Sequence, residues 1–210
     1  MRSATRRVVG LADWLAHGLA FAVGCTQVAQ RPIARLWRLS VLRAHTRGEI
    51  PVSTHFDGPV TAFGTGTVRM GVNCRLGRGV QFDTADSGEI TLGQHVRLNA
   101  GSLIAAACSV SIGDHTLIGE YVSIRDANHG TARDALIRSQ PLESSRVLIG
   151  RDVWIGRGCC ILRGVEIGDG AVIGANSVVT RNVEPGAICV GAPIRQIGMR
   201  RAPTVQPTVR

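Results

Sequence analysis

Apolar residues recur at every sixth position between Val147 and Val183 of this chain of 210 residues. The large members of this ladder are Ile149, Ile155, Ile161, Ile167, Ile173 and Val179, and smaller residues form a second ladder two positions before each of them. An α-helix repeats every 3.6 residues and a β-strand every two, so a strict period of six fits neither one long helix nor an array of hairpins. The period predicts short strands joined by turns, with three six-residue units making one 18-residue coil of a solenoid.

The same ladders continue upstream from Val68, with three breaks in register. The breaks insert four residues after Phe82, two after Ile104 and 19 after Ile124. Removing them leaves five coils, at residues 68–85, 90–107, 110–127, 147–164 and 165–182. Each coil would bury its ladder against its neighbours at a strand spacing of ~4.8 Å. The pattern therefore predicts an all-β parallel β-helix of about five coils over residues 68–183.

The longest break, residues 128–146, is too long to fit inside a coil and must project from a corner of the solenoid. Loops of this length in a compact repeat are usually functional or disordered. His129 stands at the start of this loop, and histidine titrates near neutrality and can accept a proton from a hydroxyl group. We therefore treat His129 as the leading candidate for chemistry. Asp126 or Glu143 can orient its imidazole, and a backbone carbonyl can do so equally well.

The two ends of the chain depart from the repeat. Residues 1–49 are basic and are predicted to form one or two helices, the second beginning at Pro32. Residues 50–67 are interpreted as a degenerate first coil or a cap. Residues 184–210 are interpreted as a C-terminal cap with a disordered basic tail. The N-terminal helices have two interpretations. They form a cap on the coil or on a neighbouring subunit, or they rest as a basic amphipathic segment on an anionic membrane surface.

The charge, aromatic content and cysteines of the chain limit the binding partners and the compartment that we expect. The formal charge of +9 favours anionic partners, which include phosphates, acidic lipid, nucleic acid and acidic sugars. Only one Tyr and four Phe are present and the basic residues are not interleaved with aromatic ones, so we do not expect nucleic-acid binding. None of the six cysteines forms a C-x-x-C pair, and Cys74 and Cys159 fall on the small inward ladder. Buried thiols of this kind indicate a reducing compartment, so we expect a cytoplasmic protein.

The sequence gives little support for a metal site, a phosphate-binding loop or a catalytic triad. His95 and His115 occupy matching places between ladder residues and should face outward. No H-x-H or H-x-x-x-x-H pair is present, so no metal site is expected. The chain also lacks a G-x-x-x-x-G-K-[ST] phosphate loop and any clear Ser, His and Asp set.

Three motifs resemble those of the hexapeptide-repeat acyltransferases, in particular the maltose, galactoside and capsular polysaccharide O-acetyltransferases. They are IGRDVWIG at 149–156, GVEIGDGAVIGANSVVT at 164–180 and Gly191-Ala192-Pro193, and the resemblance covers about residues 68–200. It implies a left-handed parallel β-helix, a homotrimer with active sites between adjacent subunits, and acetyl-CoA as the donor. The DANHG sequence at 126–130 resembles the histidine motif of capsule and exopolysaccharide acetyltransferases.

The resemblance also assigns roles by position. It implies that His129 is the catalytic base, that Asn99 and Asn128 bind the acceptor, and that coenzyme A is bound by Trp154, Arg157, Ala175, Thr180, Arg181 and Arg195. Ala106 and Ala107 stand where galactoside-type members carry an aspartate, which implies a different sugar pocket. Arg181 replaces the more usual lysine, and Gly198 stands where a second basic residue is expected.

The resulting hypothesis is an acetyl-CoA-dependent O-acetyltransferase. It would act on a sugar hydroxyl of a cell-envelope polysaccharide or exopolysaccharide, or of a lipid-linked precursor. The alternatives are an acetyltransferase of a free sugar or an antibiotic, a non-catalytic β-helical scaffold, and a zinc-dependent hydratase on the same fold. Binding of acetyl-CoA separates an enzyme from a scaffold, and bound zinc would be required by the hydratase.

Overall fold

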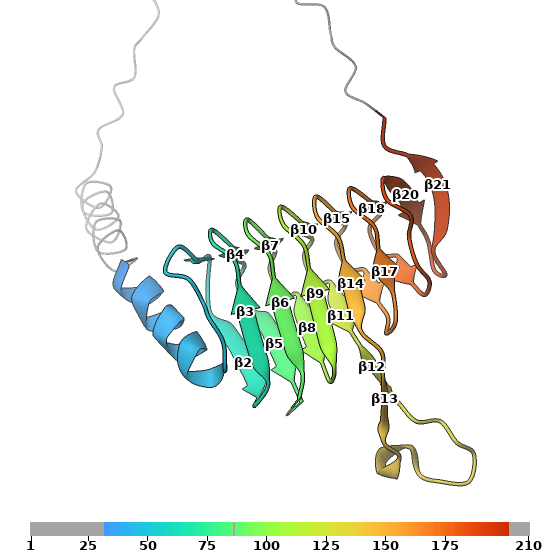
Figure 1. The fold of residues 1–210 in the computed structure, drawn as a ribbon, viewed down its shortest axis with the longest axis horizontal. Coiled ribbons are helices and arrows are strands. Elements are labelled where there is room, and N and C mark those ends of the chain that lie inside the picture. The colour runs from blue at the N-terminus through green and yellow to red at the C-terminus, as the bar shows by residue number, and fades with distance from the viewer. Residues whose placement is uncertain (1–31, 86, 202–210) are drawn as a thin grey trace, which may run out of the picture. The chain divides into compact units, whose positions relative to one another are not determined.

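A computed structural model describes residues 32–85 and 87–201. The chain divides into two units, residues 1–37 and 38–210. The described part of the second unit is a parallel β-solenoid of about seven turns, in which three sheets form the walls (Figure 1). The fold class predicted from the ladder is therefore confirmed, and the number of turns exceeds the five expected.

Each sheet takes one strand from each turn. Sheet A contains β1 (His55–Phe56), β4 (Arg75–Leu76), β7 (Arg97–Leu98), β10 (Leu117–Ile118), β15 (Trp154–Ile155), β18 (Val172–Ile173), β20 (Ala187–Val190) and β21 (Arg195–Met199). Sheet B contains β2 (Val60–Gly64), β5 (Val80–Thr84), β8 (Leu103–Ala106), β11 (Ser123–Arg125), β16 (Cys160–Ile161) and β19 (Val178–Val179). Sheet C contains β3 (Thr67–Met70), β6 (Glu89–Leu92), β9 (Ser109–Ile112), β14 (Val147–Ile149) and β17 (Glu166–Ile167). All strand pairs in these sheets are parallel except β20 with β21.

Strand register follows the large apolar ladder. In sheet A, Ile118 pairs with Leu98 on one side and Ile155 on the other. In sheet B, Ile124 pairs in the same way with Ile104 and Ile161. All six of these side chains are buried, so the interior is a stack of like residues that exclude water.

Polar members of the small ladder are buried at the corners of the solenoid. The Ser102 hydroxyl donates to the carbonyl of Gly119 at 2.8 Å, and the Thr116 hydroxyl donates to the carbonyl of Gly150 at 2.8 Å. Cys159 points its thiol to the carbonyl of Gly174, and both Cys74 and Cys159 are fully buried. Burial raises the pKa of both thiols, which keeps them protonated and inert, as expected for core residues.

The two additional turns lie at the ends of the repeat. Within residues 50–67, β1 and β2 pair in parallel with β4 and β5 and extend sheets A and B. At the other end, β20 pairs in parallel with β18, and β21 then returns antiparallel to it. The ladder underestimated the length because Pro, Gly and polar residues interrupt the period of six in both segments.

A helix covers residues 32–45 and includes the segment predicted to begin at Pro32. From Arg38 onward it belongs to the solenoid unit, where Leu39 and Leu42 join the hydrophobic core. Ile33, Leu36 and Trp37 are 61–70% exposed. The first predicted N-terminal helix and the end of the basic tail lie outside the described residues. Within the described part of the chain, no helix combines the length and apolarity needed to cross a bilayer.

Candidate functional site

The long insertion is an antiparallel hairpin that projects from the corner between sheets B and C (Figure 1). Its strands are β12 (Ala127–His129) and β13 (Leu142–Ser144), and a short 3-10 helix, η1 (Ile137–Ser139), lies in the arch between them. His129 is the last residue of β12 and pairs with Leu142. The candidate base thus stands where the hairpin leaves the coil wall, on a strand with a fixed register.

The base of the hairpin is held by Asp126, which is 1% exposed. Its carboxylate accepts hydrogen bonds from the backbone N–H groups of Ala107, Cys108 and Ser109 at 2.6–2.7 Å. Charge-assisted bonds of this kind are stronger than neutral ones. Asp126 therefore locks the neighbouring coil's turn to the start of the hairpin. The suggestion that it orients the His129 imidazole is not supported, because both of its oxygens are occupied by these backbone groups.

The arch of the hairpin is held by Gln140. Its amide nitrogen donates to the carbonyls of Ala132 and Ala135 at 3.1 and 3.0 Å, and its Oε1 accepts from the N–H of Ala132 at 2.7 Å. A Cβ at position 130 would approach Gln140 Oε1 to 2.9 Å, so Gly130 allows this close packing. The arch has no strand pairing of its own, and the hydrogen bonds of this one side chain connect its backbone instead.

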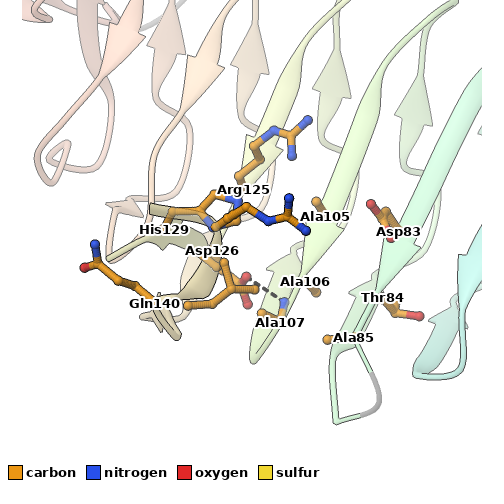
Figure 2. A pocket seen from close by; sticks show the side chains of 13 residues that line it. Asp83, Thr84, Ala85, Ala105, Ala106, Ala107, Arg125, Asp126, His129 and Gln140 are labelled. Atoms are coloured by element: carbon orange, nitrogen blue, oxygen red, sulfur yellow. Dashed lines mark hydrogen bonds between the residues drawn. The ribbon is translucent and has the colours of Figure 1, made fainter. Parts of the chain in front are cut away.

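A cavity of about 490 Å³ lies beside the hairpin (Figure 2). It is lined by Asp83, Thr84, Ala85, Ala105, Ala106, Ala107, Arg125, Asp126, Ala127, His129, Arg138, Gln140 and Leu142. The lining comes from three successive coils of sheet B and from both arms of the hairpin. Ala106 and Ala107, the positions where the resemblance expected an aspartate, are on this wall. The expected carboxylate is absent there, and these two positions contribute only methyl groups to the lining.

Three outward residues form a column across the cavity wall. Asp83 pairs with Ala105, and Ala105 pairs with Arg125. Each immediately follows a large ladder residue, so the column could have been identified by reading one position beyond Phe82, Ile104 and Ile124. Sequence reasoning missed Asp83 and Arg125 because the period of six identifies only the inward-facing positions. It missed Arg138 and Gln140 because the insertion has no period from which to place them.

The His129 side chain is exposed, and among the described residues no hydrogen bond to its imidazole is formed. Glu143, the other carboxylate suggested to orient it, instead forms an ion pair with Arg163 at 2.9 Å. In this state the imidazole is free to bond an incoming hydroxyl. Catalytic hydrogen bonds often form fully only when the substrate is present.

The other residues assigned by resemblance lie outside the cavity lining; six of them fall on two edges of sheet B, and Trp154 and Arg195 lie on sheet A. Asn128, Thr180 and Arg181 share the corner between sheets B and C with His129. Asn99, Arg157 and Ala175 lie in turns at the opposite corner, between sheets A and B. Within one chain, the residues predicted to bind coenzyme A are thus divided among these two edges and sheet A.

Several of these side chains have defined contacts. Asn99 accepts a hydrogen bond from Arg97 Nε at 2.9 Å, and the Arg181 guanidinium donates to the carbonyl of Ile194 at 2.8 Å. The Arg157 guanidinium lies 5.8 Å from the centre of the Tyr121 ring. Trp154 is 56% exposed on the outer face of sheet A, between Leu117 and Val172 in register, and Arg195 begins β21. Their predicted roles in binding coenzyme A remain predictions.

Two histidines away from the hairpin, His95 and His115, face outward, as expected. His95 and His115 are exposed and stack with ring centres 4.9 Å apart. In the described part of the chain, no three His, Cys, Asp or Glu side chains gather as metal ligands would.

Residues 146–181 match the family described as "Bacterial transferase hexapeptide (six repeats)". This match falls on the coils that carry β14 to β19, where the period of six is uninterrupted. These repeats are similar to those of the hexapeptide-repeat acyltransferases.

Two named relatives match part of the chain. One is WbbJ of Escherichia coli K12, whose name describes a lipopolysaccharide biosynthesis O-acetyl transferase; it is 37% identical over 97 residues, which are 42% of this chain and 50% of that protein. The other is nodulation protein L of Rhizobium meliloti, 47% identical over 110 residues, which are 52% of this chain and 59% of that protein. The matched regions thus span about half of one relative and 59% of the other.

Two solved structures share the solenoid fold of this chain. The N-acyltransferase AntD of Bacillus cereus, solved with dTDP and 3-hydroxybutyryl-CoA, has a TM-score of 0.65 at 17% identity and covers 77% of this chain and 87% of its own. A hexapeptide-repeat acetyltransferase of Vibrio cholerae, solved with acetyl coenzyme A, has a TM-score of 0.52 at 24% identity and covers 82% of this chain and 87% of its own. At these identities the likeness concerns the solenoid alone.

Proposed function

We propose that this chain is an acetyl-CoA-dependent O-acetyltransferase that acts on a sugar hydroxyl of a cell-envelope polysaccharide, an exopolysaccharide or a lipid-linked precursor. The observation that carries the proposal is the position of His129. An exposed imidazole stands at the rim of a cavity of about 490 Å³, on a hairpin fixed to the solenoid by Asp126. The name of one relative, WbbJ, which refers to lipopolysaccharide biosynthesis, supports a carbohydrate acceptor.

Acetyl transfer from a thioester to a hydroxyl group requires from the protein mainly a general base and correct positioning of the two substrates. His129 would take the proton of the acceptor hydroxyl as that oxygen forms a bond to the thioester carbonyl carbon. The carbon–sulfur bond then breaks, and His129 would return the proton to the departing thiolate. Because a thioester is already activated, no covalent intermediate with the protein is needed. Proton transfer contributes roughly 10²–10⁴-fold to such rates, and positioning of the two substrates can contribute more.

A homotrimer with its sites between subunits follows from the same proposal. Asn99, Arg157 and Ala175 lie on the edge of sheet B opposite the hairpin. A second copy that places this edge beside the hairpin of the first would complete the site with residues from both chains. The proposal therefore requires assembly for activity, which the mass of the active species in solution can check.

The central test is His129→Ala. We expect acetyl transfer, measured as thiol release from acetyl-CoA in the presence of acceptor, to fall by about 10²–10⁴-fold. Oligomer mass and melting temperature should remain those of the wild type, because the side chain is exposed and makes no hydrogen bond among the described residues. His115→Ala, which removes an exposed histidine on a different corner, is the matched control.

The outcomes separate the alternatives. Full activity in His129→Ala would contradict the proposal. If calorimetry detects no binding of acetyl-CoA to the wild type, the scaffold hypothesis is favoured instead. Acetylation of free sugars or antibiotics, with polysaccharide fragments left untouched, would favour the small-molecule alternative.

A lipid-linked acceptor would also suit the N-terminal helix. Ile33, Leu36 and Trp37 are exposed at helical spacing, and Arg38 follows them directly. Apolar side chains with a tryptophan beside a basic residue are typical of helices that rest on anionic bilayers. We expect the protein to sediment with vesicles containing phosphatidylglycerol and Trp37→Ser to sediment less; equal sedimentation of both proteins would contradict this contact.

A further inference from the structure

The cavity beside the hairpin carries an excess of positive charge. Its ionisable lining consists of two arginines, two aspartates and His129. The Asp126 carboxylate is buried and accepts three backbone N–H groups, so its charge is already compensated. That leaves Arg125 and Arg138 against a single exposed carboxylate, Asp83.

These two arginines differ from many others on the surface. The described residues form five ion pairs between arginines and carboxylates: Arg69–Glu89, Arg75–Asp57, Arg151–Asp169, Arg163–Glu143 and Arg200–Asp152. Neither Arg125 nor Arg138 takes part in any of them. Arg125 donates only its Nε to the Ser123 hydroxyl, at 3.3 Å. Both guanidinium groups thus keep their capacity for a bidentate partner.

The surroundings of the two arginines are ordered, and they leave room for a ligand. Arg125 stands on sheet B next to Ala105 in register, and Ala107 lies on the turn beyond (Figure 2). Arg138 stands on η1, in the arch held by the three Gln140 hydrogen bonds. One guanidinium therefore comes from the coil wall and the other from the hairpin, with small side chains on the wall beneath them.

We infer that the acceptor carries an anionic group, a carboxylate or a phosphate, which Arg125 and Arg138 bind while His129 meets a hydroxyl of the same molecule. This inference rests on the proposed acetyl transfer and names the class of its acceptor: an acidic or phosphorylated sugar. A planar guanidinium binds both anions in bidentate fashion. Asp83, at the other end of the column, is placed to accept hydrogen bonds from sugar hydroxyls.

The test compares three sugars that differ only at carbon 6: glucose, glucuronate and glucose 6-phosphate. Their binding to the wild-type protein is measured by saturation-transfer NMR at low salt. We expect at least one of the anionic sugars to bind about tenfold or more tightly than glucose. The carboxylate and phosphate arms identify which anion the site takes. The preference should shrink as salt is added, because exposed charges are screened.

Substitutions then assign the preference to the two residues. Arg125→Gln and Arg138→Gln should each bring anionic and neutral sugars to within about threefold of one another. Arg133→Gln is the matched control, because Arg133 lies in the same loop but does not line the cavity. It should retain the wild-type preference.

Three results would overturn the inference: equal binding of all three sugars, no binding of either anionic sugar, or an equal loss of preference in Arg133→Gln. Acetyl transfer from acetyl-CoA is measured separately with the same sugars. If the preference persists but no sugar is acetylated, the proposed activity fails and the anion site stands. If transfer occurs with glucose as readily as with the anionic sugars, the activity stands and the inference fails.

Discussion

The coil wall and the projecting hairpin are both built from paired β-strands, but they differ in how many neighbours each strand has. In the wall, each strand lies between like strands and its inward side chains are buried. In the hairpin, β12 and β13 pair only with each other, and residues 131–139 of the arch are all exposed. The wall is held by repetition, whereas the hairpin depends on a few individual side chains, among them Asp126, Gln140 and Glu143.

This difference separates stability from chemistry. A substitution in the wall removes packing that neighbouring coils share, so it should lower the free energy of unfolding and leave the site in the remaining folded molecules intact. A substitution in the hairpin should do the reverse, because few buried contacts depend on it. Asp126 is the exception, because it belongs to both regions.

The largest effect is expected in the wall, at Phe82. This side chain is fully buried in β5 and pairs in register with Ile104. Phe82→Ala should lower the free energy of unfolding by about 3–5 kcal/mol, through lost apolar burial and the cavity left behind. Urea denaturation measures the loss, and kcat per folded molecule should remain near the wild-type value. A large fall in kcat with little loss of stability would contradict the separation of the two regions.

The wall was also the region that sequence predicted best. A single period of six placed Ile118 against Leu98 and Ile155, and Ile124 against Ile104 and Ile161, as the strand registers have them. Stacking makes this possible, because each inward position is set by the one below it. The period failed only where Pro, Gly and polar residues blur it, and the turns at residues 50–67 and 187–190 were therefore not counted.

The candidate site was predicted less completely. His129 could be singled out because it begins the only long break in the ladder. Its surroundings could not be placed, since Arg138 and Gln140 reach the cavity through the fold of an aperiodic arch. The role of Asp126 depends on three N–H groups of a turn in the neighbouring coil, and no local pattern records that contact.

A second, intermediate effect is expected at Asp126, where the two regions join. Asp126→Asn replaces one carboxylate oxygen with an amide nitrogen, which then faces a backbone N–H it cannot accept from. The loss should be about 1.5–3 kcal/mol in the free energy of unfolding, the range for hydrogen bonds to charged groups. Because Ala107 lines the cavity, kcat should also fall. Asp134→Asn, an exposed aspartate in the arch, is the control and should change stability by less than about 0.5 kcal/mol.

The smallest effect on stability is expected in the arch, at Gln140. Gln140→Ala removes three hydrogen bonds, but the arch is exposed and should exchange them for bonds to water, so the free energy of unfolding should fall by about 1 kcal/mol or less. The loss should appear instead as faster hydrogen exchange of the Ala132 amide and as a higher KM for the acceptor, since Arg138 would no longer be held beside the cavity. Gln140→Glu keeps the acceptor for the Ala132 amide and loses both donated bonds, so its KM should lie between those of the wild type and Gln140→Ala. If exchange at Ala132 and the acceptor KM stay at wild-type values in Gln140→Ala, the hairpin owes its order to contacts other than this side chain, and the contrast between a wall held by repetition and an arch held by single residues would not hold.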